Sequence, residues 1–535
     1  MSALGGSTRA MALGTVASRA TGFLRTAVIA SVLGVYGVGT AYTVANTTPN
    51  IVYELLLGGV LTSVVVPLLV RAAKEDGDEG QAYAQRLLTL TVLVLGGAAV
   101  VLVLAAPLLI DLYAGDLDPA SRDLAIVFAR LFLPQVLFYG AGAVLGAVLN
   151  TRGRYAPPMW APVLNNLVVI ATGIVFLLVR GRAELTPESL TSGQIALLGI
   201  GTTLGIVAQT VALVPSLRAA GFSLRPRWDV GALDLRRIGR LAKWVLLYVV
   251  ANQLAFFVVV RLASADELVD AGRGFASYTY AFLLWQLPHA IVAVSVITAL
   301  LPRMSRAAAD ERTDDLRASL NRGLRLTVSV LVPAAVAFVV LGRDLATLVF
   351  ARGEVSVADA RFIGLLLAVF AVGLVPFSTY QLQLRAFYAL QDTRTPTLIN
   401  LGVNVTLVLV GVLLYVALPD RYEVLGLAAG HASSFVAGLA LCSVVLSRRL
   451  GGLDVAVVVR TGVRCLVAAL LPGLLAYGVV VGIDRVLDRG PLASALALAL
   501  AGGVLGVGYV LLTRRMRVPE VAEVAGPVLR RVGLR

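Results

Sequence analysis

The 535-residue chain is 58% hydrophobic and only 14% charged, whereas a soluble protein carries about 25% charged residues. This composition excludes a soluble globular protein and indicates a polytopic membrane protein. The net charge of +14 would suggest nucleic-acid binding in a soluble chain, but here the basic residues gather in the connections between apolar segments. We therefore expect topology signals and attraction to membrane lipids, and no nucleic-acid partner.

The first apolar segment, from about Met11 to Leu33, is long enough to span a bilayer and yet contains Arg19 and Arg25. An arginine near the centre of a spanning helix costs roughly 2.5–3.5 kcal/mol on insertion scales, so both side chains are expected to face protein or water. Gly22 lies between them on one side of the predicted helix, where it would leave space between cations roughly 9 Å apart along the axis. The segment therefore predicts a cleft lined by two cations, which an anionic substrate could enter.

Apolar runs of about 20 residues, taken in chain order, predict fourteen membrane-spanning helices. Their centres lie near residues 22, 57, 99, 136, 169, 205, 250, 288, 329, 373, 407, 436, 471 and 502. The connections Ser216–Lys243 and Pro302–Arg325 are rich in arginine, while those on the opposite side, such as Asp111–Asp123, are acidic or balanced. The positive-inside rule then predicts a multi-pass protein of the plasma membrane with both termini in the cytoplasm.

Local patterns recur about 240 residues apart and predict an internal duplication. Pro157 lies eight residues before Asn165, and Pro396 lies eight residues before Asn404, in corresponding spans. Six helices is an even number, so the two halves would enter the membrane in the same orientation, as parallel repeats. The predicted fold is all-α, with a six-helix lobe at 1–217, a second six-helix lobe at 218–450, and two extra helices with a basic tail at 451–535.

Two six-helix lobes predict a substrate site at their interface near the membrane midplane, opened alternately to each side. Polar residues at membrane depth are its candidates, because hydrocarbon offers them no water. The predicted cavity residues are Arg19, Arg25, Asn46, Glu54, Asn252, Gln253 and Gln286, and the predicted hinges are Gly22, Pro49 and Pro288.

Two of these assignments have alternatives that the sequence leaves open. The amides could serve as hydrogen bonds between helices, which are worth roughly 0.6 kcal/mol each on average. Glu54 could be a counter-ion to the arginines, a cation or proton site, or a residue near the outer rim.

The sequence lacks the motifs of an enzyme or an ATP-driven pump. There is no G-x-x-x-x-G-K-[ST] loop to hold phosphates, and no nucleophile elbow or serine–lysine pair. The two histidines, His289 and His431, are too few and too scattered for a metal site, and the two cysteines lie in apolar segments. We therefore expect transport without a metal or cofactor.

An ordered set of motifs resembles the MurJ/MviN family, the lipid II flippases of the multidrug/oligosaccharidyl-lipid/polysaccharide exporter superfamily. The resemblance extends over essentially the whole chain and is carried by the order of the motifs. They include Ser18-Arg19…Gly22-Phe23…Arg25, Thr43-Val44-Ala45-Asn46…Pro49-Asn50, Val65-Val66-Pro67, Arg130…Pro134, Gln286-Leu287-Pro288, Leu301-Pro302-Arg303 and Arg385-Ala386-Phe387-Tyr388.

The resemblance implies that the chain moves lipid II, a peptidoglycan precursor linked to undecaprenyl pyrophosphate, from the inner to the outer leaflet. It implies a V-shaped cationic cavity, a groove at the last two helices for the lipid tail, and alternating access driven by membrane potential or a coupling ion. It also implies cell-wall synthesis proteins as candidate partners. A pyrophosphate suits arginine, which binds phosphates through several hydrogen bonds at once.

Two cations that the family pattern leads us to expect are replaced here. Tyr53 stands at the position of an arginine in the second span, and Leu283 at that of an arginine in the eighth. Three explanations stay open. The chain could follow the pattern of an actinobacterial branch, it could export another undecaprenyl-linked glycan or an amphiphile, or it could be a non-transporting scaffold for cell-wall enzymes.

Overall fold

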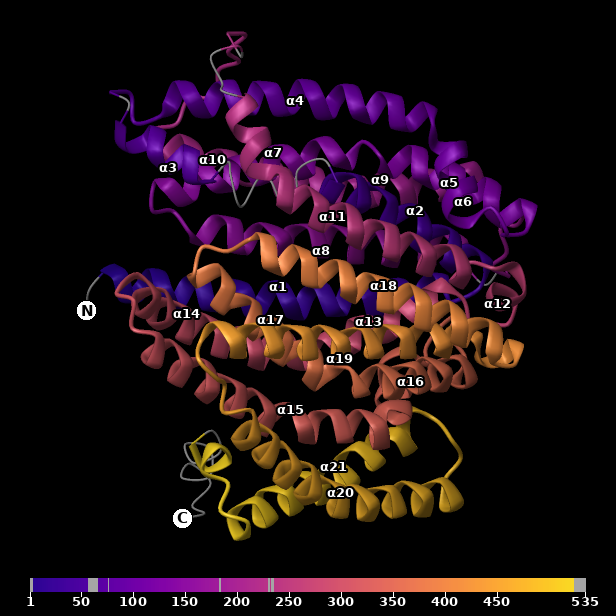
Figure 1. Ribbon diagram of the computed structural model, residues 1–535. Helices are drawn as coiled ribbons and strands as arrows, with labels where there is room; N and C mark the ends of the chain where they lie inside the picture. Colours follow the sequence, from indigo (N-terminus) through magenta and orange to yellow (C-terminus); the bar gives the residue numbers. More distant parts are fainter. Residues whose placement is uncertain are drawn as a thin grey trace. The chain divides into compact units, whose positions relative to one another are not determined.

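A computed structural model of the chain describes residues 3–55, 66–75, 77–181, 184–229, 231 and 235–523. Every regular element in these ranges is a helix, as the sequence predicts (Figure 1). Contacts between Cα atoms divide the chain into two compact units, Met1–Ala276 and Ser277–Arg535.

In the first unit, α1 packs against α8 and α8 against α9, while α2 packs against α6 and α4 against α7. The helices of this unit are α1 (Ala3–Leu33), α2 (Gly37–Tyr53), α3 (Val66–Glu75), α4 (Gln81–Leu104), α5 (Ala106–Ala114), α6 (Pro119–Phe132), α7 (Gln135–Thr151), α8 (Ala156–Arg180), α9 (Ser192–Val211), α10 (Val214–Ala219), α11 (Leu235–Ala263) and α12 (Asp266–Asp270).

In the second unit, α15 is the helix against which α16, α17, α20 and α21 all pack, and α18 packs along α19 (Figure 1). The elements are α13 (Phe275–Pro288), the π-helical turn η4 (His289–Ala293), α14 (Val294–Ala309), α15 (Thr313–Phe350), α16 (Val357–Val372), α17 (Leu374–Ala389), α18 (Arg394–Ala417), the 3₁₀ turn η5 (Asp420–Tyr422), α19 (Glu423–Arg449), α20 (Val455–Val486) and α21 (Pro491–Arg515).

Most of the predicted spans appear as helices. Among the described residues, 12 helical stretches are long and apolar enough to cross a membrane, and the pair α16 and α17, bent by 48°, makes a thirteenth. These thirteen contain every predicted centre except the one near residue 57. That centre lies outside the described residues, so the polytopic all-α class is confirmed while the count of fourteen stays a prediction.

The packing pattern recurs along the chain, as the predicted duplication requires. The fourth predicted span is broken between α6 and α7 at Leu133 and Pro134, and its counterpart is bent between α16 and α17 at Gly373. In the first unit α9 packs on α6, α7 and α8, and in the second α19 packs on α16, α17 and α18. The same four-helix arrangement therefore occurs once in each unit.

The division of the chain by contacts differs from the predicted domain limits. The first unit extends to Ala276 and includes α11, which packs on α5, whereas the predicted lobe ends at residue 217. The second unit includes α20 and α21, which the sequence sets apart as 451–535. The division by contacts shows which helices touch, whereas the predicted limits follow the internal duplication of the sequence. The predicted limits of the two repeats therefore stay a prediction.

The crossing of α18 and α19 leaves no room for side chains. A Cβ atom on Gly430 of α19 would lie 2.5 Å from the Cα atom of Gly411 on α18, and one on Gly426 would lie 2.7 Å from the carbonyl carbon of Leu414. Small residues four apart let two membrane helices approach until their backbones touch, which gains van der Waals contact. These glycines therefore set the spacing of the two helices.

We expect Gly430→Ala to lower the stability of the protein by about 1–3 kcal/mol, because the added methyl group must push α18 away from α19. The measurement is the midpoint of thermal unfolding in detergent. The matched control is Gly478→Ala on α20, where an added Cβ meets nothing within 4 Å. Equal unfolding midpoints for the two variants would show that α18 and α19 can move apart without loss of stability.

Candidate functional site

The two arginines of the first span lie on one unbroken helix, α1, and differ in exposure. Arg19 is exposed and Arg25 is half-buried. Glu54, the acidic partner that the sequence offers in the second span, is exposed and caps the end of α2. Among the described residues, Glu54 forms no ion pair with either arginine. The positive charge on α1 is therefore not neutralised by this acid.

Arg25 belongs to a group of polar side chains in the first unit that we call the tyrosine cluster: Arg25, Asn50, Tyr53, Gln135 and Tyr139. The hydroxyl of Tyr139 donates to Oε1 of Gln135 over 3.3 Å, and the side chain of Asn50 lies close to it. The charge of Arg25 acts on the Tyr139 hydroxyl, and the rings of Tyr53 and Tyr139 lie with centroids 5.7 Å apart. Three helices, α1, α2 and α7, thus bring one cation and several hydrogen-bonding groups together.

The sequence predicts that Gly22 faces open space between the two arginines, but in the structure Gly22 faces a neighbouring helix. A Cβ atom there would lie 3.4 Å from Nδ2 of Asn166 on α8. That amide nitrogen donates to the carbonyl of Ser18 over 3.2 Å and to Oγ1 of Thr21 over 3.0 Å. The glycine allows α8 to approach α1 closely, and Asn166 holds the two helices together. A hinge at Gly22 stays a prediction.

The predicted amides lie on several helices. Asn46 is half-buried on α2, one turn before the tyrosine cluster, and its carbonyl accepts a hydrogen bond from Nδ2 of Asn50 over 3.1 Å. Asn252 and Gln253 are half-buried on α11 of the first unit, and Gln286 is half-buried on α13. The buried Oε1 of Gln253 accepts no hydrogen bond from the described residues, which leaves it available to a ligand or to water.

The two predicted proline hinges lie where backbone hydrogen bonds are missing or altered. Pro49 is buried inside α2, where it has no N–H to donate to the preceding turn. Pro288 ends α13 and is followed directly by the π-helical turn η4 before α14 continues the span. π-Helical turns occur often at functional sites. These positions suit bending, and the bending itself stays a prediction.

Both histidines lie in one aromatic cluster of the second unit, although they are far apart in the sequence. Nδ1 of His289 is 2.9 Å from Oγ of Ser378, and Nδ1 of His431 is 2.8 Å from the Tyr278 hydroxyl. The ring of Phe377 lies beside His289, with centroids 4.4 Å apart. Each histidine is held by a hydroxyl group, and the described residues contain no group of three metal-ligating side chains.

The second unit also contains an apolar groove of about 860 Å³, bounded by α15, α16, α17, α19 and α20. Along α15 its wall extends from Asn321 to Val340, which is about 28 Å at 1.5 Å per residue. That length matches the roughly 30 Å hydrocarbon core of a bilayer. Most lining side chains are Val, Leu or Ala, and Nε2 of Gln383 donates to Oγ of Ser443 over 2.8 Å at the groove wall. A long hydrocarbon chain fits these dimensions and this lining.

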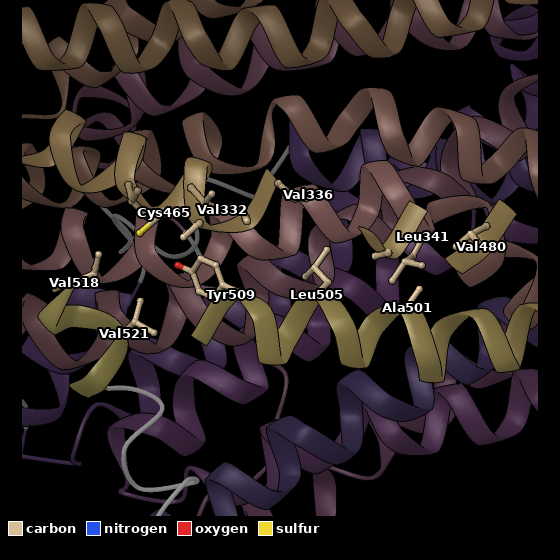
Figure 2. Close-up of a cluster of buried hydrophobic side chains, with 14 of the residues drawn as sticks. Val332, Val336, Leu341, Cys465, Val480, Ala501, Leu505, Tyr509, Val518 and Val521 are labelled. Carbon is tan, nitrogen blue, oxygen red and sulfur yellow. The ribbon is translucent and has the colours of Figure 1, made fainter. Parts of the chain in front are cut away.

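Buried side chains behind the groove fasten α20 and α21 to α15 (Figure 2). Leu505 and Tyr509 of α21 pack in one cluster with Val332 and Val336 of α15, and the Tyr509 hydroxyl donates to the carbonyl of Ser329 over 2.5 Å. This cluster fixes the position of the groove wall.

Polar contacts join α15 and its neighbours at different levels. In the first half of α15, Arg325 pairs with Glu520, which follows α21, over 3.0 Å. Toward the end of α15, Ser494 of α21 donates to the buried carboxylate of Asp344 over 3.1 Å, and Arg361 of α16 pairs with Asp484 of α20 over 3.5 Å. The groove is therefore bounded by helices held at several levels.

A family model described as "Lipid II flippase MurJ" matches residues 29–489 of the chain. The chain belongs to the lipid II flippase MurJ family. A "Probable lipid II flippase MurJ" of Rhizobium meliloti (strain 1021) is 28% identical over 406 residues, which is 74% of this chain and 73% of the relative. A "Lipid II flippase MurJ" of Burkholderia cenocepacia is 27% identical over 397 residues, 73% of this chain and 74% of the relative.

Solved structures share the fold. A structure titled "Lipid II flippase MurJ, inward closed conformation" superposes with a TM-score of 0.74 at 17% identity and covers 95% of this chain and 99% of its own. An inward-facing transporter of the MATE family, in the MOP superfamily, superposes with a TM-score of 0.64 at 16% identity, covering 81% and 94%. The expected superfamily fold is thereby confirmed.

Membership of the MurJ family does not by itself assign the arginines, because the matched region begins after both Arg19 and Arg25. At the two positions where the family pattern leads us to expect further cations, Tyr53 joins the tyrosine cluster and Leu283 is half-buried on α13. Tyr53 places an aromatic ring beside Tyr139, tilted by 44° to it, where the family pattern leads us to expect a charge. Among the described side chains of the cluster, Arg25 is the cation.

Sequence reasoning missed Tyr139, Gln135 and the histidine cluster. Tyr139 and Gln135 are four residues apart and so share one helix face, which was the available signal. Nothing in the sequence indicates that this face meets α2, or that His289 and His431 join one aromatic cluster through Phe377 and Phe435. Those contacts depend on how the helices pack.

Proposed function

We propose that this protein moves lipid II across the plasma membrane, from the cytoplasmic to the outer leaflet. Family membership over residues 29–489 carries the proposal. Two features of the fold support it. The half-buried Arg25 offers a cation for a pyrophosphate, and the groove beside α15 offers an apolar surface as long as a bilayer is thick.

In this proposal, Arg25 binds the pyrophosphate and Arg19 assists it from the exposed side of α1. Asn46, Glu54, Asn252, Gln253 and Gln286 contact the polar head group, and the undecaprenyl tail lies in the groove. Charge-assisted hydrogen bonds to phosphate are roughly twice as strong as neutral ones, so the two arginines supply most of the recognition of the pyrophosphate.

The transport cycle in the proposal is alternating access of two lobes, bent at Gly22, Pro49 and Pro288, without ATP hydrolysis or other catalysis. Membrane potential or a coupling ion supplies the energy. The basic connections favour a topology with both termini in the cytoplasm, where cell-wall synthesis proteins are the candidate partners in this proposal.

Replacing the essential lipid II flippase of a host bacterium with this chain tests the proposal. We expect growth, together with lipid II that becomes accessible to a label added outside the cell. Failure to grow, with another lipid-linked glycan bound to the purified protein, would identify an exporter of that glycan, which the absence of arginine at Tyr53 and Leu283 favours as the second candidate. Failure without any bound glycan would point to a scaffold.

A further inference from the structure

The segment that follows α10 in the first unit is fixed against α4. Nε2 of Gln85 donates to the carbonyl of Ser223 over 2.7 Å, and the backbone N–H of Arg227 donates to Oγ1 of Thr89 over 2.9 Å. Asp229 pairs with Arg86 of the same helix, with 2.8 Å between Oδ2 and Nε. These contacts hold residues 220–229 in a defined conformation at the end of the membrane-spanning helices.

This segment forms a small cavity of about 400 Å³. Gly221 has a φ of +75°, a backbone conformation that favours glycine, and it turns the chain at the end of α10. The cavity is lined by Arg218, Gly221, Phe222, Ser223, Leu224 and Arg225. We call it the α10 pocket.

The arginines around the α10 pocket fall into two groups. Arg86 pairs with Asp229, Nη1 of Arg152 donates to the carbonyl of Ala220 over 2.6 Å, and Nε of Arg227 donates to Oε1 of Gln85 over 3.1 Å. Those three build the segment. Arg218 and Arg225 line the pocket, are exposed, and form no ion pair with any described residue. Two uncompensated guanidinium groups beside one cavity favour an anion with several oxygen atoms.

The position of the pocket indicates what that anion is attached to. The spanning stretch that contains α9 and α10 ends at Ala219, so Arg218 lies in its last turn. Beyond it, the side chain of Trp228 is 72% exposed and that of Leu224 is 38% exposed. Exposed tryptophan beside basic residues at the end of a span is typical of the membrane–water interface, where lipid phosphates lie.

We propose that the α10 pocket binds the phosphate of an anionic phospholipid head group between Arg218 and Arg225, with Leu224 and Trp228 resting on the lipid. The site shares no residue with the tyrosine cluster or the groove, and it does not depend on which substrate the protein transports. Binding at this site would anchor the end of the sixth predicted span to anionic lipids of the surrounding leaflet.

Native mass spectrometry of the full-length protein in detergent tests the proposal, with phosphatidylglycerol or phosphatidylethanolamine added as the probe. We expect a phosphatidylglycerol adduct on the wild type that weakens about fivefold for Arg218→Gln or Arg225→Gln and about 25-fold for the double variant, since each basic residue near a membrane surface contributes about one factor of five. Arg218→Lys, which retains the charge, should keep more of the adduct. The control is Arg303→Gln on α14, an exposed arginine far along the chain from the pocket.

Three outcomes would overturn the proposal. The double variant could keep the full adduct, or Arg303→Gln could weaken it as much, which would show a general effect of charge. Excess inorganic phosphate could displace the lipid completely, which would make free phosphate the ligand. Thermal unfolding of each variant, expected to match the wild type because both arginines are exposed, separates loss of the site from loss of the fold.

Discussion

Arg25→Ala is expected to abolish growth in a strain that depends on this chain for flipping lipid II, at unchanged abundance in the membrane. A hydrogen bond to a charged group contributes about 1.5–3 kcal/mol, so losing the cation should weaken substrate binding roughly tenfold to hundredfold. The loss should be large because Arg25 is the cation of the tyrosine cluster, with Tyr53 at a position where the family pattern leads us to expect another. Growth and the labelling of lipid II from outside the cell measure it.

Two further substitutions separate charge from geometry. Arg25→Lys keeps the charge without the planar fork of donors and should restore part of the activity. Arg154→Ala removes an exposed arginine from the same unit, outside the cluster, and should leave growth unchanged. If Arg25→Ala and Arg19→Ala both support growth at normal rates, the arginines of α1 do not hold the substrate.

The second large effect is expected from blocking the groove. Val339 of α15 and Val463 of α20 line it and are 56% and 55% exposed. In the double variant Val339→Trp/Val463→Trp, two indole rings would occupy the groove and shorten the surface that holds the lipid tail. We expect most of the flipping activity to be lost, because the indole rings would exclude the undecaprenyl tail from the surface along which it lies in the proposed function.

The control for the groove is a pair of valines of similar exposure that do not line it. Val405 of α18 is 56% exposed and Val444 of α19 is 51% exposed. Val405→Trp/Val444→Trp adds the same bulk to the lipid-facing surface and should retain near-normal activity. Equal loss in both double variants would assign the effect to general disturbance of the membrane helices, and equal retention would place the tail elsewhere.

The sequence predicted the helices well because their signal is local. A run of apolar residues of bilayer length specifies a spanning helix whatever surrounds it, and thirteen predicted centres lie on such helices. The prediction that amides join helices also has a local basis, and Asn166 bonds α8 to α1 in this way. Likewise, Arg25 stood out because a charge at membrane depth is costly.

What the sequence could not give is the rotation of each helix about its axis and the identity of its neighbours. Gly22 was expected to face an opening and instead faces Asn166, because α8 occupies that side of α1. Tyr139 enters the cluster only because α7 meets α2. The family resemblance implies a groove at the last two helices, but the observed groove is lined by α20 and not by α21, and its opposite wall is α15, whose residues precede those of α20 by well over a hundred positions.

That separation along the chain bears on how the protein is made. Asp344 is 2% exposed in the finished fold and receives a hydrogen bond from Ser494, and the carbonyl of Ser329 receives one from Tyr509. Both donors belong to α21, which leaves the ribosome well over a hundred residues after α15. Until it inserts, α15 stands in the bilayer with a carboxylate that lacks this partner, a costly arrangement in lipid. Insertion of α21 therefore supplies the hydrogen-bond donors that Asp344 and Ser329 of α15 accept. A nascent chain that lacks α21 exposes these polar groups of α15, and the quality-control machinery of the cell can bind them.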